Sequence, residues 1–344
     1  MTGLQRVQLT DERWRSFVAA RHDATAFHTP AWAKMLCECY DLSGFALASL
    51  DESGSVAAGM PVVELPGLFR SGTRWVSLPF TDSCAPLAVE RAHGQQFLDR
   101  LEEARTEANV DRLEIRSAVA LQSARQFTAA LVHSLALESD PDAVLHRLDR
   151  SQVQRNIRRA QREGIVVRQA DREADLDRVF FELQVMTRRR LGVPIQPRRF
   201  YTLLWRRLIE PGHGFLLLAY AGPRPIAGGV FLRAGRTLAY KYGASSHEHW
   251  HLRPNVLLFW TAIQLGCASG AQVLDFGRTD LKDHGLRSFK LNWGTREQPL
   301  TYTVVGRPRP NAIKKLQPAL GKVIQHSPPW VCRAVGARLY RYAA

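Results

Sequence analysis

The order of the predicted elements in the second half of the chain restricts the possible folds more than any other feature of this sequence. Apolar residues at helical spacing, short β-rich runs, and proline or glycine near element ends define these elements. Strands that alternate with helices predict an α/β domain with a mixed sheet. In chain order, the predictions are helix 141–163, strand 165–168, helices 174–190 and 198–208, strands 215–221, 225–232 and 237–243, helix 254–268, strand 272–276, helix 285–292 and strand 300–305.

The first half of the chain shows a second α/β pattern. A chain of 344 residues is longer than one hydrophobic core usually supports. We therefore expect two domains, residues 1–140 and 141–309, followed by a helical tail at 310–344. The elements predicted in the first half are helix 30–40, strands 44–50, 56–65 and 74–78, helix 93–108 and strand 112–116.

Charge divides the chain in a similar way. Residues 1–140 hold 13 Lys and Arg against 18 Asp and Glu, whereas residues 141–344 hold 34 against 14. The net charge is therefore −5 in the first part and +20 in the second. A strongly basic half predicts a polyanionic partner, such as coenzyme phosphates, a nucleotide-linked substrate, RNA or an anionic membrane surface.

Several classes of protein are excluded by simple patterns. The longest apolar run, 256–265, is about half the length of roughly 20 residues that a membrane-spanning helix needs. The first 20 residues contain no apolar core of a signal peptide, so we expect a cytoplasmic protein. The five cysteines are odd in number and include no Cys-x-x-Cys pair, which argues against a disulfide framework or a zinc site.

Residues 272–294 have the pattern of an active-site segment. A buried strand is expected to end near Asp275, whose carboxylate would bind the amides of the following turn. That turn alternates glycines with ionisable side chains before a short helix. Charged loops that follow core strands are where α/β enzymes place reactive groups on a rigid scaffold. The candidates in this segment are Arg278, Asp280, Asp283 and Lys290.

A family resemblance rests on short motifs in both halves of the chain. In the second half these are residues 151–166, Tyr240–Ser245, Leu252–Asn255, Asp275–Asp280 and Phe289–Gly294, and in the first half they are Thr29–Trp32 and Ser77–Asp82. Together with the element order, they resemble the FemAB-like branch of the GNAT acyltransferase superfamily. The resemblance covers residues 25–305 and is stronger in the second half.

This resemblance implies an α/β fold with mixed sheets, in which two tandem GNAT-like domains transfer an acyl or aminoacyl group to an amine. The donor would lie where the parallel strands 237–243 and 272–276 diverge. No tightly bound cofactor is implied, and the co-substrate would be acyl-CoA or aminoacyl-tRNA. The long helical arm of some family members has no counterpart here, and the glycine-rich loop that grips coenzyme A in ordinary GNAT enzymes is replaced by Ser246–Asn255.

Four residues are candidates for the chemistry of acyl transfer. The resemblance implies that Lys290 lies close to the reaction centre, where a cation could stabilise an oxyanion or hold a phosphate; otherwise it is an exposed lysine on an amphipathic helix. Asp280 or Asp283 could accept a proton from the amine, or either could cap the helix. Tyr242 could donate a hydrogen bond to the donor carbonyl or simply pack.

Further candidates would bind the two substrates. Arg253 and Asn255 lie at the predicted start of helix 254–268, where amide hydrogens and the helix dipole favour an anion, although structural capping is the competing interpretation. Arg278 joins them as a donor-binding candidate. The resemblance places Asp82 and the neighbouring Phe80 near the acceptor, while a turn-forming role for Asp82 is the alternative.

Three alternating histidines, His247, His249 and His251, could face one side of an extended segment as metal ligands. No carboxylate or cysteine completes a convincing ligand set around them. The resemblance implies no metal either, so we expect a metal-free site.

Basic residues outside the active-site segment suggest further contacts with anions. Four arginines lie on one broad face of the predicted helix 141–163: Arg155, Arg158, Arg159 and Arg162. They form either a solvated face or a contact with phosphate or nucleic acid. The tail at 310–344 reads as two amphipathic, basic helices separated by Ser327–Pro329. These helices either pack on the core or make a peripheral contact with an anionic membrane.

These observations predict an N-acyltransferase of cell-envelope or polysaccharide biosynthesis. It would move an acyl group, with acyl-CoA as the expected donor, directly to an amine of a precursor and without a covalent enzyme intermediate. Two other interpretations stay open. One is an aminoacyl-tRNA-dependent aminoacyltransferase of the peptidoglycan-bridge type, and the other is a non-catalytic RNA- or membrane-binding module. The expected location is the cytoplasm or the inner face of the membrane.

Overall fold

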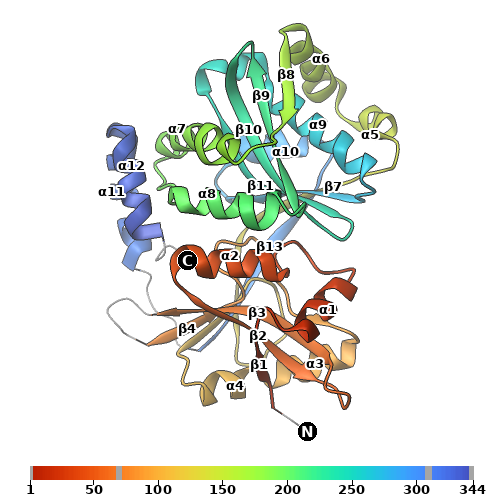
Figure 1. Cartoon of the computed structure of the whole chain (residues 1–344), viewed down its shortest axis with the longest axis vertical. Helices are drawn as coiled ribbons and strands as arrows, with labels where there is room; N and C mark the ends of the chain where they lie inside the picture. The colour runs from red at the N-terminus through yellow and green to blue at the C-terminus, as the bar shows by residue number, and fades with distance from the viewer. Residues whose placement is uncertain (1–2, 67–71, 307–311, 341–344) are drawn as a thin grey trace. The chain divides into compact units, whose positions relative to one another are not determined.

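The computed structural model describes residues 3–66, 72–306 and 312–340, with side chains for all of these except 312–318 and 339. Residues 310, 311 and 341–344 of the predicted tail therefore lie outside the described residues. The chain divides into two compact units (Figure 1). Unit 1 comprises residues 1–131 and 298–310, and unit 2 comprises residues 132–297 and 311–344.

Unit 1 is built on a mixed sheet with the strand order β1-β2-β3-β4-β6-β13, to which β5 adds by pairing with β3. Strands β4 and β6 are parallel, and the other neighbours along this order are antiparallel. The strands are β1 (Gln5–Val7), β2 (Ser43–Leu50), β3 (Val56–Pro66), β4 (Thr73–Val76), β5 (Leu87–Ala88), β6 (Arg112–Ile115) and β13 (Arg296–Gly306).

The helices of unit 1 are α1 (Glu12–Ala20), α2 (Pro30–Tyr40), α3 (Arg91–Asp99) and α4 (Leu101–Glu107). Helix α2 begins at Pro30, whose missing N–H costs nothing at the first helical position, and ends at Asp41 in a left-handed conformation. One core cluster of unit 1 joins strand residues such as Trp75 to Phe97 of α3. The α/β pattern predicted for the first half is therefore present.

Unit 2 is built on a mixed sheet with the strand order β7-β12-β11-β10-β9-β8. Strands β11 and β12 are parallel, whereas β8, β9, β10 and β11 form an antiparallel ladder. The strands are β7 (Arg125–Ala136), β8 (Ile165–Gln169), β9 (Gly214–Ala221), β10 (Arg224–Ala234), β11 (Thr237–Ser245) and β12 (Val273–Thr279). Strand β7 contributes residues to both units, as does β13.

Helices cover both faces of the unit 2 sheet, as Figure 1 shows. Helices α6 and α9 pack on one face, where Ile157 and Phe259 share a core cluster with Phe231 and Phe276. On the other face, Phe200 of α8 packs against Tyr242. The helical segments of unit 2 are α5 (Pro141–Arg147), η2 (Arg150–Gln154), α6 (Arg155–Arg162), η3 (Asp175–Phe180), α7 (Phe181–Leu191), α8 (Arg198–Leu204), η4 (Trp205–Ile209), η5 (His247–Leu252), α9 (Pro254–Ala268), α10 (His284–Leu291), α11 (Ala312–His326) and α12 (Pro329–Leu339).

The two C-terminal helices, α11 and α12, belong to unit 2 and pack beside α7. Arg189 of α7 donates a hydrogen bond from Nε to the carbonyl oxygen of Ser327 at 2.6 Å, and Arg333 pairs with Glu182 at 2.6 Å. Gly336 allows α12 to approach closely, because a Cβ there would lie 1.8 Å from the carbonyl oxygen of Ile195. The described part of the tail predicted at 310–344 therefore forms two helices that share the unit of α7.

The units divide the chain differently from the expected boundaries at 140 and 309. Strand β13 joins unit 1 because it pairs with β6 from Thr303–Ile115 to Gly306–Arg112. The helix predicted over 141–163 is wrong as one element. It is interrupted at Leu148 and Asp149, because the Asp149 carboxylate accepts hydrogen bonds from the Ser151 and Gln152 amides and starts a new helix.

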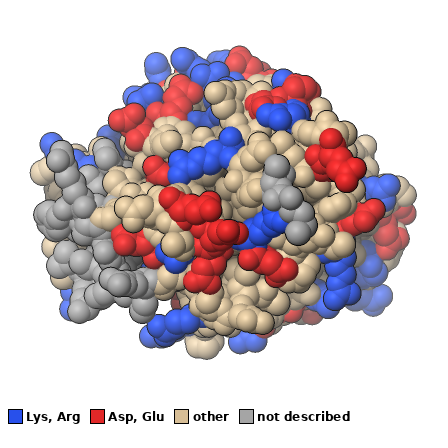
Figure 2. Space-filling view, turned by 90° about the horizontal axis from the view of Figure 1, so that it is seen from below, with Lys and Arg blue, Asp and Glu red and all other residues tan. Residues whose placement is uncertain are grey.

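Two surface observations bear on the partners suggested by charge. Figure 2 shows acidic side chains near the middle of one face of the molecule with basic side chains around them, so this face is not a surface of a single charge. Among the residues that the structure describes, no helix is long and apolar enough to cross a membrane.

Candidate functional site

The parallel strands β11 and β12 diverge after a short pairing. Their register runs from Thr237–Val273 to Ala239–Asp275, while β11 continues to Ser245 and β12 to Thr279. Beyond Ala239, β11 pairs with β10 on its other side. The ends of β11 and β12 therefore form the two sides of the position where the resemblance implies that a donor binds.

Helix α7 supplies polar partners for the backbone at the end of β11. Gln184 donates a hydrogen bond from Nε2 to the Gly243 carbonyl oxygen at 3.0 Å. The Thr187 hydroxyl accepts from the Ser245 amide at 3.1 Å and donates to the Ser245 carbonyl oxygen at 3.3 Å. Both side chains are buried, so they replace hydrogen bonds that a neighbouring strand would otherwise provide. Within the described residues, Gln184 Oε1 is buried without a hydrogen-bond partner.

The start of α9 is also tied to the end of β11. Ser245 Oγ accepts hydrogen bonds from Trp250 Nε1 at 2.8 Å and from Asn255 Nδ2 at 3.4 Å. Arg253 precedes the helix in a left-handed conformation with φ 60°, and its side chain is exposed. Asn255 therefore connects two elements of unit 2, and Arg253 lies at the surface beside the first turn of α9.

A β-bulge decides where Tyr242 points. The register between β10 and β11 shifts between Val230–Tyr242 and Phe231–Tyr240, so one extra residue is inserted in β11. Tyr240 accordingly packs on Phe231 and Phe259, whereas Tyr242 packs on Phe200 of α8. Alternation along a regular strand would place both tyrosines on the same face. The side chain of Tyr242 is buried against α8 at the end of β11.

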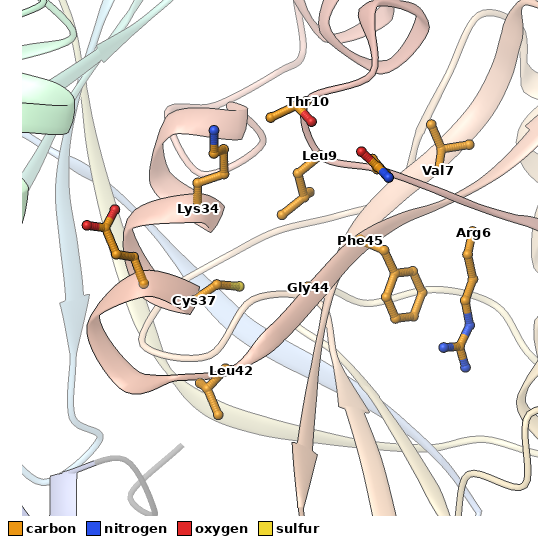
Figure 3. A pocket seen from close by; sticks show the side chains of 11 residues that line it. Arg6, Val7, Leu9, Thr10, Lys34, Cys37, Leu42, Gly44 and Phe45 are labelled. Atoms are coloured by element: carbon orange, nitrogen blue, oxygen red, sulfur yellow. The ribbon is translucent and has the colours of Figure 1, made fainter.

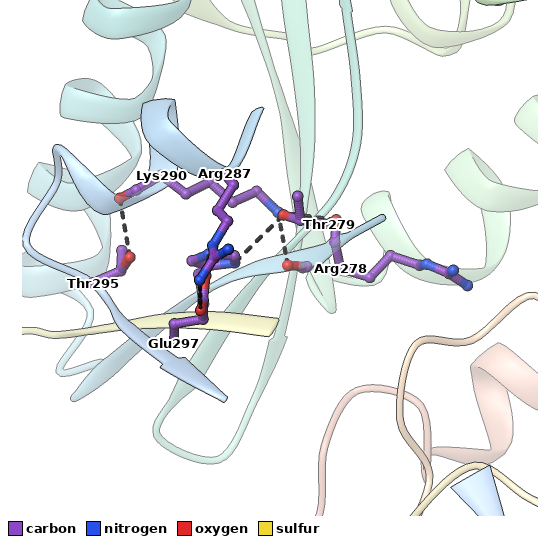
Figure 4. A network of polar contacts seen from close by, with 8 residues as sticks. Arg278, Thr279, Arg287, Lys290, Thr295 and Glu297 are labelled. Atoms are coloured by element: carbon purple, nitrogen blue, oxygen red, sulfur yellow. Dashed lines mark hydrogen bonds and ion pairs between the residues drawn. The ribbon is translucent and has the colours of Figure 1, made fainter. Parts of the chain in front are cut away.

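Lys290 is a buried cation rather than an exposed lysine on an amphipathic helix, with only 2% of its surface accessible. Its Nζ donates to the carbonyl oxygens of Gly277 at 2.7 Å and Arg278 at 3.0 Å (Figure 4). Successive carbonyls of a regular strand point in opposite directions. The left-handed conformation of Gly277, with φ 70°, allows both to reach one ammonium group. Asp275 accepts from the Gly277 amide at 2.8 Å, which confirms its predicted role in this turn.

The two aspartates after β12 are exposed and bind nearby amides. Asp283 is the N-cap of α10 and accepts from the Leu286 amide at 2.9 Å. Asp280 accepts from the Lys282 amide at 3.2 Å. Arg278 contributes its carbonyl to Lys290, while its exposed side chain points away from the network in Figure 4. These geometries match the capping alternative for Asp283 and leave both carboxylates accessible from solvent.

A buried network that sequence reasoning missed surrounds Lys290. His133 of β7 is fully buried, with Nε2 3.0 Å from Glu297 Oε2 and Nδ1 3.4 Å from Thr279 Oγ1. Arg287 donates from Nε and from a terminal nitrogen to the two Glu297 oxygens, both at 2.7 Å. No local signal could have found this network, because His133 and Glu297 are 164 residues apart and β7 was not predicted.

The charges of this network determine the protonation of its members. Burial lowers the pKa of His133 below its ordinary value of 6.5, and the positive charge of Lys290 lowers it further against the opposing effect of Glu297. The hydrogen bond from Arg287 lowers the pKa of Glu297. His133 is therefore neutral at pH 7. It donates from Nε2 to the Glu297 carboxylate, which leaves Nδ1 to accept the Thr279 hydroxyl proton.

The acceptor candidates lie in unit 1. Phe80 has a left-handed backbone with φ 60°, and its ring packs on Tyr40 at 4.9 Å between centroids. The Asp82 carbonyl oxygen accepts a hydrogen bond from the Tyr302 hydroxyl at 2.9 Å. The structure thus shows local packing for both residues, and their assignment to the acceptor stays a prediction.

The predicted basic face of α6 is present in unit 2. Ile157 and Ala160 are buried on its inner side. On its outer side the four arginines remain largely solvent-accessible, and their contacts are local: Arg158 donates to Gln154 Oε1 at 3.2 Å and Arg159 lies 3.9 Å from Glu163 Oε1. Arg155 and Arg162 are exposed. The geometry suits either a solvated face or a contact with phosphates.

The three alternating histidines do not converge. Residues 247–252 form the helical segment η5, in which the His247 ring packs on Trp250. His249 Nδ1 lies 2.9 Å from Ser246 Oγ, and His251 Nδ1 lies 3.0 Å from the Glu248 carbonyl oxygen. Within the described part of the chain, no cluster of three or more His, Cys, Asp or Glu side chains is arranged to hold a metal ion.

A cavity of about 420 Å³ lies in unit 1 and contains none of the predicted site residues (Figure 3). Cys37, Leu42 and Phe45 supply its apolar lining, and Arg6 and Lys34 add charge. Burial raises the pKa of the Cys37 thiol to about 11, so this thiol is protonated and unreactive at neutral pH. This cavity is separate from the candidate site in its residues and its chemistry.

Comparison with known proteins identifies the domain that contains the candidate site. The family described as the acetyltransferase (GNAT) domain matches residues 147–290. These residues are a GNAT domain. The matched range begins just before η2 and ends at Lys290, so it contains the divergent ends of β11 and β12.

Relatives extend the likeness to the FemAB-like branch of the GNAT superfamily. A lipid II:glycine glycyltransferase of Staphylococcus saprophyticus is 38% identical over 76 residues, which cover 20% of this chain and 18% of that protein. The match thus spans less than a fifth of the curated relative. Together with the structural likeness to FemX, it confirms the resemblance that the sequence motifs indicated.

Solved structures confirm the fold class. The crystal structure of FemX matches 87% of this chain and 96% of its own chain, with a TM-score of 0.69 and 17% sequence identity. A tandem GNAT protein from the clavulanic acid biosynthesis pathway matches 89% of this chain and 99% of its own, with a TM-score of 0.50 and 10% identity. The predicted α/β fold with tandem GNAT-like domains is therefore correct.

Proposed function

We propose that this GNAT protein is an N-acyltransferase whose reaction takes place in unit 2, at the divergent ends of β11 and β12. The observation that supports this most is the buried ammonium of Lys290, bound to two carbonyl oxygens where β12 ends. A fixed positive charge in a site with little water stabilises negative charge on a carbonyl oxygen during attack by an amine. Lys290 would stabilise that oxyanion or hold a phosphate of the donor.

Other residues of unit 2 would position the reacting groups. Gln184 Oε1 is a buried acceptor near the end of β11 and would bind an N–H of the attacking amine. Tyr242 would donate a hydrogen bond to the donor carbonyl. Asp280, which is exposed two residues after the Arg278 carbonyl that binds Lys290, would take the proton released by the amine directly or through water, and Asp283 would serve as the second candidate. The amine would attack the donor directly, without a covalent enzyme intermediate.

Two observations favour an aminoacyl-tRNA donor over the acyl-CoA donor expected from the sequence. The start of α9 offers few amide hydrogens to a pyrophosphate, because Pro254 has none and the Val256 amide bonds the Arg253 carbonyl oxygen at 3.1 Å. The accessible arginines of α6 suit the phosphates of RNA. Arg253 and Arg278 would contact the donor from the surface.

The likeness to lipid II:glycine glycyltransferase also supports transfer of an aminoacyl group to an amine of a cell-envelope precursor. Asp82 and Phe80 would contribute to acceptor binding from unit 1. Both candidate donors are made in the cytoplasm, which is where we place the reaction. Acyl transfer to a polysaccharide precursor is the second candidate.

A donor-exchange experiment tests this function. The purified chain is incubated with an acceptor mixture and either charged tRNA or acetyl-CoA, and the products are followed by mass spectrometry. We expect transfer from charged tRNA and its loss after ribonuclease treatment. A variant that combines Arg155→Gln, Arg158→Gln and Arg162→Gln should bind tRNA more weakly and with a smaller salt dependence. Transfer from acetyl-CoA that survives ribonuclease treatment would instead support acyl transfer to a polysaccharide precursor.

We also propose that the C-terminal helices make a peripheral contact with anionic lipid. Residues 298–344 contain no Asp or Glu, and Trp330 and Val323 are 65% and 53% exposed. Aromatic and basic side chains together bind the interface of an anionic bilayer. We expect sedimentation with phosphatidylglycerol vesicles, reduced by Trp330→Ala and by high salt. Equal binding to phosphatidylcholine vesicles, or binding that Trp330→Ala leaves unchanged, would contradict this contact.

A further inference from the structure

The network around His133 forms a closed circuit of contacts within unit 2. Helix α10 contributes both Lys290, which binds the end of β12, and Arg287, which binds Glu297. Glu297 contacts His133, and His133 contacts Thr279, the last residue of β12. The circuit thus connects α10 to β12 twice, once through Lys290 and once through Arg287, Glu297, His133 and Thr279.

The circuit acts on the two carbonyls that bind Lys290. Thr279 follows Gly277 and Arg278 directly, and the register of β12 with β11 ends at Asp275. The pairing with β11 therefore does not constrain this last part of β12. On its other side β12 neighbours β7, and there the Thr279 hydroxyl contacts the fully buried His133. Movement of Thr279 would move the adjacent Arg278 carbonyl relative to the Lys290 ammonium.

We propose that His133 is a positioning residue for Lys290. With Glu297 on one ring nitrogen and Thr279 on the other, it holds the end of β12 where the Gly277 and Arg278 carbonyls fix the ammonium. The role of Lys290 in catalysis rests on the proposed function, but its positioning by His133 is a separate property of the folded protein. His133 itself would not touch substrate.

The charged groups around His133 make this arrangement sensitive to acid. Lys290 and Arg287 face it from α10, and Glu297 faces it from β13. A neutral imidazole accepts the Thr279 proton at Nδ1, whereas a protonated one must donate there and is repelled by both cations. The pKa of His133 is lowered, so folding favours its neutral form. The stability that this form contributes is complete above the ordinary value of 6.5 and declines as pH falls below it, and the arrangement itself is lost as pH falls through the lower pKa of the folded protein.

The inference can be tested without an enzymatic assay, through the ammonium signals of the seven lysines in a chain labelled with ¹⁵N-lysine. Loss of a signal in Lys290→Met assigns Lys290. We expect this signal to be protected in the wild-type protein and to broaden in His133→Gln and Thr279→Val, but to be retained in Thr279→Ser, which keeps the hydroxyl. The control His146→Gln changes an exposed histidine and should leave it unchanged.

Acid titration adds a measurement that would show no change if His133 only filled space in the core. The Lys290 signal should change as pH falls through the pKa of His133, which lies below 6.5 in the wild-type protein, and should lose this response in His133→Gln. Glu297→Gln, a milder change, should also perturb the signal if His133→Gln fails to fold. In a transfer assay, Thr279→Val should lower kcat about tenfold with little change in KM for the donor.

A Lys290 signal that is unaltered in folded Thr279→Val and Glu297→Gln would overturn the positioning role. The proposed function is judged separately, by transfer in Lys290→Met. If that variant stayed active while the signals behaved as expected, the positioning role would stand and the catalytic role of Lys290 would be rejected.

Discussion

Replacing Lys290 with methionine is expected to lower the rate of acyl transfer by about a hundredfold or more, the usual effect of removing a group that stabilises an oxyanion. Methionine has a similar length and fits a buried position, so the substitution removes the charge with little change in volume. The loss should appear in kcat rather than in KM for the acceptor, because the proposed interaction is stronger in the transition state. Steady-state transfer with the donor identified by the exchange experiment measures both constants.

The matched control is Lys282→Met, which removes the same group from an exposed position between Asp280 and Asp283. Its transfer rate should stay within about twofold of the wild-type rate, because a surface charge is largely screened. Lys290→Met also leaves the Gly277 and Arg278 carbonyls without this donor, which costs about 1–3 kcal/mol of stability. Activity is therefore compared well below the melting temperature. Unchanged kcat in folded Lys290→Met would refute the catalytic assignment.

Replacing Trp293 with alanine is expected to lower the free energy of unfolding of unit 2 by about 3–5 kcal/mol, as for other buried aromatic residues. Trp293 is fully buried and packs against the rings of Phe259, Phe276 and Phe289, with centroids 5.8, 5.8 and 6.3 Å away. It follows α10 and therefore joins the helix that carries Lys290 to the core. Urea unfolding followed by circular dichroism measures the change.

Trp330→Ala provides the comparison, since it makes the same substitution at a residue that is 65% exposed. Its effect on the free energy of unfolding should be within about 0.5 kcal/mol. A similar loss in both variants would show that the cluster around Trp293 contributes no more than a surface contact. Trp293→Ala should also reduce transfer at temperatures where the fold persists, because α10 would be less firmly held.

Much of unit 2 could be predicted because its signals are local. Pro254 and the apolar residues after it predicted helix 254–268, and α9 has the same bounds. Strands β9, β10 and β11 lie within a few residues of their predictions because apolar runs and turn residues define them. The helix predicted at 141–163 was wrong because the Asp149 cap outweighs the continuous helical spacing.

The candidate site was predicted only in part. The position of Lys290 on a short helix after a buried strand was inferred correctly, but the alternative of an exposed lysine is wrong. Tyr242 was expected at the end of its strand, whereas its orientation depends on a bulge that the sequence pattern does not reveal. Gln184 and Thr187 lie within the predicted helix 174–190 but were not among the candidates, and only their contacts with β11 show their role.

Helical spacing, caps and turn residues act over a few neighbouring positions, so they predicted most of the elements of unit 2 and the segment that carries Lys290, while the short motifs indicated the GNAT-like class. What Lys290 and its surroundings bind depends on the tertiary structure. His133, Thr279 and Glu297 meet through contacts between β7, β12 and β13, and burial then sets the charge of His133. Such contacts depend on which strands become neighbours, and that is settled by the packing of the whole unit.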